Sequence, residues 1–250
     1  MDTMDIIEPQ GIRTMKQRAL SHFLTELLKS EVENSVARII LFGSLLKDEI
    51  RKESDIDLLV VAVDSPYEVS KACADAAFET ALATEESVEP LVRCIDEIRY
   101  PQSYFLYSIL KHGQEVYRMN AEELRKKESQ NYLELASEYL EGSRAASQGR
   151  HFRIAVDASY NACELLIKAL LLTRLPDIPG SHGGIVNKFG ELFVKTGEVP
   201  KELGRAVGLA LEKRNNARYE PHSEITKEHA EEIINLAERL RQILEDKMGQ

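Results

Sequence analysis

The fold of this chain is decided by residues 36–63, which read VARIILF, then GS, then LLKDEIRKES, and then DIDLLVVAV. Both apolar flanks are rich in β-branched residues, a pattern typical of buried strands. The first flank ends at Gly43-Ser44, and ten residues later the second begins with Asp55 and Asp57. Side chains two residues apart along a strand point to the same face. We therefore expect the two carboxylates to project together while the residue between them turns into the core.

Two carboxylates held side by side repel each other, which raises the pKa of one of them unless a cation lies between them. Oxygen ligands at this spacing suit Mg²⁺, which shares its coordination sphere with substrate phosphates. The turn at Gly43 and Ser44 offers backbone N–H groups and a hydroxyl at an expected helix start, where a phosphate binds well. A phosphate-binding turn beside a paired-carboxylate metal site predicts two-metal nucleotidyl transfer.

A third carboxylate is expected from a neighbouring strand, and Glu89 is the candidate. Residues 88–95 predict a strand, Pro90 indicates that it is an edge strand or bulged, and Glu89 is its only acid. The alternative is that Glu89 is only the solvated end of that strand, and the sequence leaves both open. Asp96 and Glu97 follow the strand and are expected in the first turn of a helix.

The surrounding pattern changes character halfway along the chain. Up to Arg118, helical periodicity at residues 20–28, 69–82 and 103–111 alternates with strand patterns, the last at residues 115–118. After Met119 no strand pattern follows, and helices are expected at residues 185–194 and 201–217, with single apolar faces along 154–170 and 233–244. The prediction is an α+β domain at residues 1–118, a linker or helix start at 119–127, and an all-α antiparallel helical bundle at 128–250.

Composition narrows the class of protein further. The 250 residues are 43% hydrophobic and 30% charged, which excludes a disordered or low-complexity chain. The 42 acids exceed the 32 bases, and this net charge of −10 gives no long-range attraction to nucleic acid or anionic lipid. The three cysteines are far apart and predict buried reduced thiols. The N-terminus has no signal-peptide pattern, and the longest apolar run, residues 58–63, is too short for a membrane span, so we expect a cytoplasmic protein.

With these motifs in place, residues 41–61 resemble the minimal nucleotidyltransferase family, relatives of the kanamycin nucleotidyltransferases in the DNA polymerase β superfamily. The resemblance extends over residues 14–118. It implies a mixed sheet with flanking helices, in which Asp55 and Asp57 bind Mg²⁺ and the triphosphate of an NTP, with ATP as the expected one. Glu89 would complete the metal site or act as the base.

The same resemblance implies that Gly43 and Ser44 contact phosphate. Many relatives carry a small or basic stretch after Gly-Ser, often with a second glycine, whereas this chain continues Leu45-Leu46-Lys47-Asp48. Lys47 is the first candidate to supply the missing phosphate contact, and Arg51 and Lys52 are the others.

The second half resembles the helical HEPN domain over residues 125–248, on the motifs at residues 181–184, 193–197 and 214–219. Active HEPN ribonucleases place Arg-x4-6-His near a helix end, so that two subunits bring an Arg and a His to one RNA phosphate. Arg214 matches the arginine, but Tyr219 stands five residues later, and His222 is eight residues away. An unperturbed tyrosine is a poor proton shuttle at neutral pH. We therefore expect Arg214 and Tyr219 to form a structural or interface pair.

The leading hypothesis is Mg²⁺-dependent transfer of a nucleoside monophosphate from an NTP to a hydroxyl of a small molecule or a protein tyrosine, with AMP as the expected group. The helical domain would form part of the acceptor site or the interface of a homodimer. The alternatives are a HEPN ribonuclease or toxin-like module regulated by the first domain, or a binding module that has lost its catalysis. RNA binding is not favoured, and no membrane contact is expected.

Overall fold

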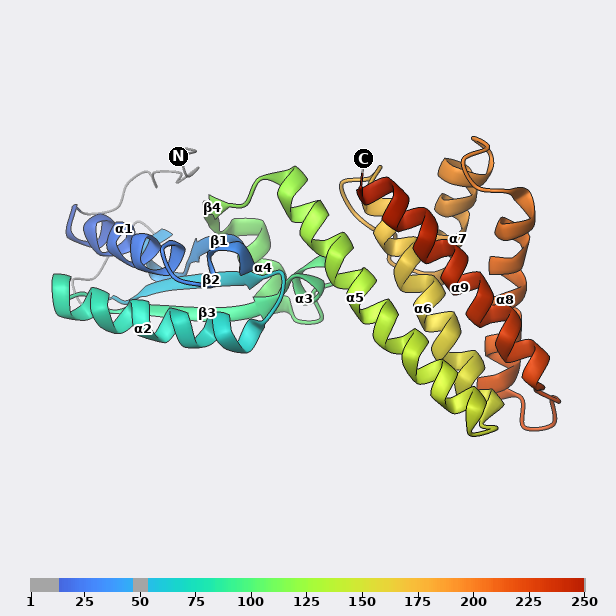
Figure 1. Cartoon of the computed structure of the whole chain (residues 1–250). Helices are drawn as coiled ribbons and strands as arrows, with labels where there is room; N and C mark the ends of the chain where they lie inside the picture. Colours follow the sequence, from blue (N-terminus) through green and yellow to red (C-terminus); the bar gives the residue numbers. More distant parts are fainter. Residues whose placement is uncertain (1–13, 47–53, 250) are drawn as a thin grey trace. The chain divides into compact units, whose positions relative to one another are not determined.

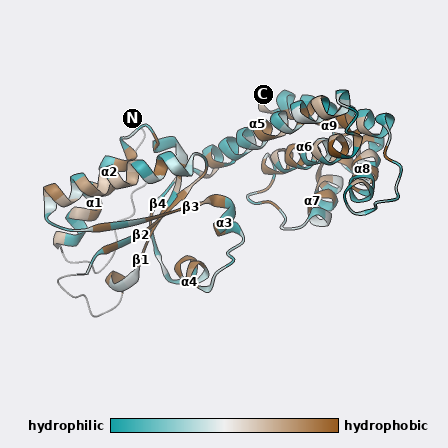
Figure 2. Cartoon of the chain, turned by 90° about the horizontal axis from the view of Figure 1, so that it is seen from below, coloured by the Kyte–Doolittle hydropathy of each residue, from teal (hydrophilic) through white to brown (hydrophobic). Residues whose placement is uncertain are grey.

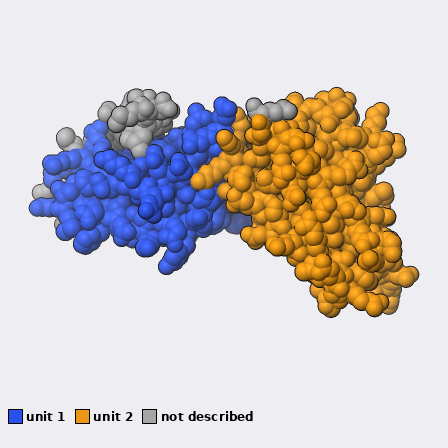
Figure 3. Space-filling view, in the orientation of Figure 1, with its two compact units in different colours: residues 1–124 blue, residues 125–250 orange. Residues whose placement is uncertain are grey.

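The computed structural model describes residues 14–46 and 54–249. The chain divides into two compact units, residues 1–124 and residues 125–250, which are coloured separately in Figure 3. Figure 1 labels the elements: the first unit combines a sheet with helices, and the second is helical. The expected α+β fold followed by an antiparallel helical bundle is confirmed.

In residues 14–46 and 54–249, four strands form one mixed sheet in the order β3-β2-β1-β4. Their bounds are Val36–Phe42 (β1), Ile56–Ala62 (β2), Val88–Cys94 (β3) and Gln114–Arg118 (β4). β1 runs antiparallel to β2 and β4, whereas β2 and β3 are parallel. The parallel pair is joined by the helix α2 (Pro66–Thr84), as a crossover between parallel strands requires. β3, which contains Pro90, is an edge strand as predicted.

Helices cover both faces of this sheet. In Figure 2, α1 (Thr14–Leu28) and α2 lie on one side, and α3 (Ile95–Arg99) and α4 (Tyr104–His112) lie on the other. Alternate strand residues fill the two cores. Ile39, Ile56 and Leu58 pack towards α1 and α2, and Ile40 and Leu59 pack towards α3 and α4. The pleat therefore sends odd-numbered residues of β2 to the α3/α4 face.

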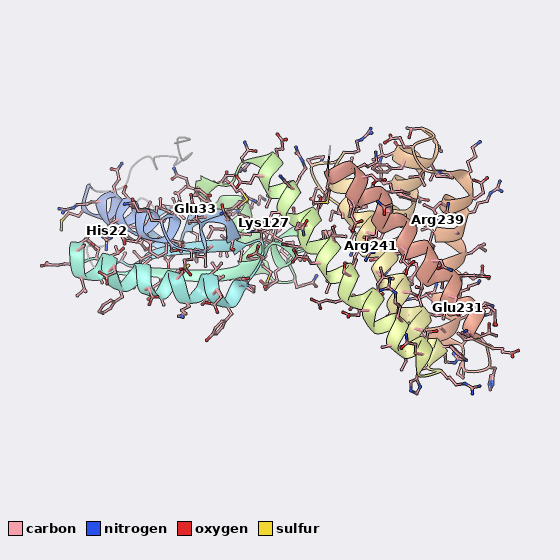
Figure 4. The ribbon with its side chains drawn as sticks, viewed as in Figure 1. His22, Glu33, Lys127, Glu231, Arg239 and Arg241 are labelled. Carbon is pink, nitrogen blue, oxygen red and sulfur yellow. The ribbon has the colours of Figure 1, made fainter. Side chains whose placement is uncertain are left out.

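Polar contacts tie the two helices of the first face together. The ring of His22 on α1, which is labelled in Figure 4, lies 3.1 Å from the Thr80 hydroxyl on α2. Lys16 at the start of α1 is buried and forms an ion pair with Glu86, just after α2. These contacts fix the helical layer on the face opposite the carboxylates.

The second unit is built around one central helix. Its helices are α5 (Ala121–Gln148), whose first four residues belong to the first unit, α6 (Phe152–Leu172), α7 (His182–Phe189), α8 (Lys201–Tyr219) and α9 (Lys227–Met248), with a π-helical turn, η3 (Gly190–Val194), after α7. α6 contacts α7, α8 and α9. Its second half is buried on nearly all sides, so it forms the middle of the bundle core (Figure 1).

Two expectations were wrong in detail. The predicted single apolar face along residues 154–170 does not describe α6, because Ile154 is 61% exposed whereas residues 165–167 and 169–172 are buried all round the helix. The three cysteines are free, but Cys94 is only half buried, since it ends the edge strand. Within the described residues no helix is long and apolar enough to cross a membrane.

Candidate functional site

The carboxylates singled out by the sequence lie on one face of the sheet. Asp55 immediately precedes β2 and Asp57 is its second residue, and both are half buried while Ile56 is fully buried. Asp57 is paired in register with Glu89 on the parallel strand β3. Because Leu59 and Leu91 of the same strands belong to the α3/α4 core, the side chains of Asp57 and Glu89 also point to that side of the sheet.

The Gly43-Ser44 turn closes around Asp57. Asp57 is the register partner of Phe42, the last residue of β1, and the short 3-10 turn η2 (Gly43–Leu46) follows at once. The backbone N–H of Ser44 donates a hydrogen bond to the Asp57 carboxylate. Gly43 has φ +83°, and a Cβ there would lie 1.9 Å from Asp57 Oδ2. Glycine is therefore required both by the backbone conformation and by the carboxylate that occupies the side-chain position.

The electrostatics of this edge favour a cation. Burial raises the pKa of the Asp57 carboxyl above its usual value, and the negative charges of Glu89 and Asp55 raise it further. The Ser44 hydrogen bond acts in the opposite direction. Carboxylate oxygens are the ligands that Mg²⁺ takes in proteins. A divalent cation would offset the repulsion among these groups, so the donor set fits Mg²⁺.

The three carboxylates are neighbours without forming a closed metal cage. Among residues 14–46 and 54–249, no group of three or more His, Cys, Asp or Glu side chains has the spacing of a complete ligand set. Glu89 is exposed on the edge strand, so its side chain is the one least fixed by packing. Lys47, Arg51 and Lys52 lie outside the described residues.

One feature beside the carboxylates was not anticipated from the sequence. An open pocket of about 360 Å³ lies between α4 and the end of β1, lined by Phe42, Gly43, Leu46, Phe105, Ser108, Ile109, His112 and Gly113. Aromatic residues in the 103–111 helix were visible in the sequence. Their position depends on the pairing of β4 with β1, which the sequence pattern does not give.

In the helical unit, Arg214 and Tyr219 belong to a compact cluster. Arg214 on α8 is only 8% exposed, and its Nε lies 3.2 Å from Asp157 Oδ1 on α6. Its guanidinium also lies over the rings of Tyr160 and Tyr219, 5.8 and 5.9 Å from their centroids. Arg218 reaches the same Asp157 oxygen at 3.7 Å. Asp157 was not identified from the sequence, because it precedes Arg214 by 57 residues and carries no motif.

The turn after α8 is held by a single arginine. The Arg153 guanidinium on α6 donates hydrogen bonds to five backbone carbonyls, those of Asn216, Ala217, Glu220, Pro221 and Ser223. His222 lies exposed in this turn. No described hydrogen bond or ion pair joins His222 to Arg214. His182 begins α7 and pairs with the Glu164 carboxylate on α6.

Comparisons with known proteins separate the same two regions. The family described as "Polymerase beta, Nucleotidyltransferase" matches residues 24–122, and the HEPN domain family matches residues 129–247. "Putative toxin MJ0142" of Methanocaldococcus jannaschii is 34% identical over 119 residues, which are 47% of this chain and 80% of that protein. "Putative toxin MJ0605" of the same organism is also 34% identical, over 113 residues, 45% of this chain and 83% of that protein.

Among solved structures, the chain is similar to the spectinomycin adenyltransferase AAD(9) from Enterococcus faecialis, crystallised with ATP and spectinomycin. That similarity covers 91% of this chain and 98% of the other at 13% identity, with a TM-score of 0.31, and it carries no argument about activity. The two family matches and the two sequence relatives are the stronger findings. The chain belongs to the HEPN family through residues 129–247, and residues 24–122 form a nucleotidyltransferase domain of the polymerase beta type.

Proposed function

We propose that the nucleotidyltransferase domain transfers a nucleoside monophosphate from an NTP to a hydroxyl group, and that AMP is the group transferred. The observation that supports this proposal is that Asp57 is the register partner both of Glu89 and of Phe42, which leads into the Gly43-Ser44 turn, while the charge of nearby Asp55 raises the Asp57 pKa. Carboxylates bind divalent cations, and backbone N–H groups with a hydroxyl bind phosphate. Mg²⁺, when bound, lowers the pKa of the attacking hydroxyl and neutralises the charge on the leaving pyrophosphate.

The residues of this chain take separate parts in that reaction. Asp57 is held in place by the Ser44 N–H and, with Asp55, would hold the cation. The hydroxyl oxygen of the acceptor forms a bond to the α-phosphorus, and the bond from that phosphorus to the bridging oxygen of the pyrophosphate breaks. Glu89 is exposed, and we assign it the role of receiving the hydroxyl proton and passing it to water. The pyrophosphate leaves with the electron pair of the broken bond.

The test is incubation of the full chain with Mg²⁺ and each of the NTPs, followed by assay of pyrophosphate and intact-mass measurement. Transfer to a residue of the protein would add one nucleoside monophosphate to its mass. The matched control is the double variant Asp55→Asn and Asp57→Asn, which keeps the side-chain shapes and removes the charge. Pyrophosphate release that persists in the double variant would contradict the proposal. Mg²⁺–NTP binding by the wild type without pyrophosphate release would favour a binding module that has lost its catalysis.

A second candidate comes from the relatives that are named as toxins: the helical domain acts on RNA. The exposed ring of Tyr219, which lies beside Arg214 and Arg218, is the observation that favours a function at this point. The engagement of Arg214 by Asp157, with a tyrosine in place of the histidine, argues against RNA cleavage there. The acceptor, the homodimer and the cytoplasmic location stay predictions from the sequence.

A further inference from the structure

The pocket between α4 and β1 opens on the same sheet face as the three carboxylates. Phe42 packs against the α3/α4 core and is the register partner of Asp57. Gly43 belongs to both places: it lines the pocket, and the carboxylate of Asp57 fills its side-chain position. A molecule whose phosphates lie against the Gly43-Ser44 turn would therefore have the pocket directly beside it.

The walls of the pocket suit a flat aromatic group. Phe42 and Phe105 meet edge to face, with ring centroids 5.8 Å apart, and the Phe105 side chain is 57% exposed. The exposed face of the ring is available to pack against a flat group in an offset-stacked arrangement. Ile109 is buried and supplies an apolar floor.

Gly113 brings the backbone of the chain close to β1 at the far side of the pocket. A Cβ at Gly113 would lie 2.5 Å from the Ile40 side chain and 3.0 Å from the Leu41 carbonyl oxygen. This close approach, together with the Ser103 cap that accepts a hydrogen bond from the Leu106 N–H at 3.2 Å, fixes α4 against the sheet. The pocket is therefore formed by packed elements of the first unit.

Two polar side chains at the pocket have hydrogen-bonding capacity to spare. Ser108 is half buried and His112 is exposed, and both line the cavity. Neither forms a hydrogen bond or an ion pair with any described residue. A hydroxyl and an imidazole beside two aromatic rings are the groups that bind a nucleobase, which has a π-face and a polar edge.

We propose that this pocket binds the base of the NTP, with Phe105 covering the face of the base and Ser108 or His112 at its polar edge. The inference rests on the proposed nucleotidyl transfer, because the triphosphate is what brings the base to this position. It adds a binding element that lies outside the Gly-Ser and Asp-x-Asp motifs. Phe105 is a binding residue here and takes no part in the chemistry.

The experiment compares two ligands that share phosphates and differ in the base: Mg²⁺–ATP and Mg²⁺–tripolyphosphate, measured by titration calorimetry on the full chain. We expect wild type to bind ATP more tightly than tripolyphosphate. Phe105→Ala should weaken ATP binding about tenfold, which corresponds to about 1.4 kcal/mol of lost stacking, and leave tripolyphosphate binding unchanged. The matched control is Phe78→Ala on α2, a phenylalanine that is 62% exposed and distant in the fold, which should change neither affinity.

A second variant gives a direct readout of stacking. The chain contains no tryptophan, so Phe105→Trp introduces one fluorophore, whose emission ATP should quench and tripolyphosphate should not. Equal affinity of wild type for the two ligands, or no quenching by ATP, would overturn the assignment of the pocket. Failure of both Mg²⁺–ATP and Mg²⁺–tripolyphosphate to bind would instead contradict the carboxylate site and the proposed function, so the two failures are distinguishable.

Discussion

Replacement of Gly43 by alanine tests how the turn and the carboxylate are built together. The backbone at Gly43 has φ +83°, a left-handed conformation that costs an L-residue about 1–2 kcal/mol. The added Cβ would also lie 1.9 Å from Asp57 Oδ2, a separation that forces the carboxylate to move. Moving it breaks the hydrogen bond from the Ser44 N–H, which is worth about 1–2 kcal/mol as a bond to a charged group that is partly solvated. We expect a total loss of about 3 kcal/mol in the free energy of unfolding.

The chain supplies a matched control at Gly197. This glycine also has φ +83°, but no atom of a described residue other than its chain neighbours lies within 4 Å of a Cβ built on it. Gly197→Ala should therefore show the backbone cost alone, about 1–2 kcal/mol, while Gly43→Ala shows that cost and the collision. Urea unfolding followed by circular dichroism measures both losses. Calorimetry with Mg²⁺–tripolyphosphate measures the consequence for the site, which we expect to be lost in Gly43→Ala and kept in Gly197→Ala.

Two results would refute this reasoning. Equal losses of stability in the two variants would mean that the Asp57 carboxylate does not occupy the side-chain position of Gly43. Unchanged tripolyphosphate binding by Gly43→Ala would mean that the position of Asp57 beside the turn is not needed to hold the phosphates. Either outcome is accessible with purified protein and does not depend on knowing the acceptor.

Four further predictions follow from charges and contacts elsewhere. Burial and like charges raise the pKa of Asp57 in the folded, metal-free protein above its unfolded value of about 3.8. The contribution of this group to the free energy of unfolding is therefore fully present below pH 3.8, and it is lost as the pH rises through the folded pKa. Asp57→Asn should abolish that loss, raise the melting temperature of the metal-free protein by about 2–4 °C, and remove further stabilisation by Mg²⁺; a melting temperature that responds to Mg²⁺ in the variant would count against the site. The wild-type protein should leave single-stranded RNA uncleaved in EDTA, and Tyr219→His is the comparison variant. Cleavage by the wild type that is lost in Arg214→Ala would favour the ribonuclease function over nucleotidyl transfer. Arg153→Ala should lower the free energy of unfolding by about 2–3 kcal/mol, because five backbone carbonyls lose a charged donor. The control Arg239→Ala, on the exposed side of α9 (Figure 4), should lower it by under about 0.5 kcal/mol. Equal losses would show that the carbonyl contacts are not made in solution. Sedimentation should reveal self-association at micromolar concentration, and a 28.3 kDa species alone would contradict the homodimer.

The sequence predicted most of the first unit because its signals are local. Alternation along a strand was enough to predict that Asp55 and Asp57 share one face. Pro90 indicated an edge or a bulged strand, and β3 is an edge strand. The pairing of Asp57 with Glu89 is a contact between strands 32 residues apart, so the sequence supplied only a candidate.

Contacts between distant segments account for what the sequence did not predict. The pocket needs α4, which precedes β4, to be packed against β1, and β1 and β4 are separated by more than seventy residues. Asp157 and Arg214 meet only because α6 and α8 pack side by side. Apolar periodicity predicted that α6 is a helix, but it could not show that other helices surround it, which is why Ile154 was assigned to a buried face.

The strand order has a consequence for how the protein is made. β1 lies between β2 and β4, yet the 51 residues 63–113 must leave the ribosome after β2 and before β4 begins. At about 5–20 residues per second, this takes roughly 3–10 s. During that time one edge of β1 has open N–H and C=O groups, and an open edge pairs readily with other nascent chains. Synonymous changes that slow the emergence of residues 63–113 from the ribosome should therefore increase aggregation of the newly made chain, whereas changes that act after β4 has emerged should not.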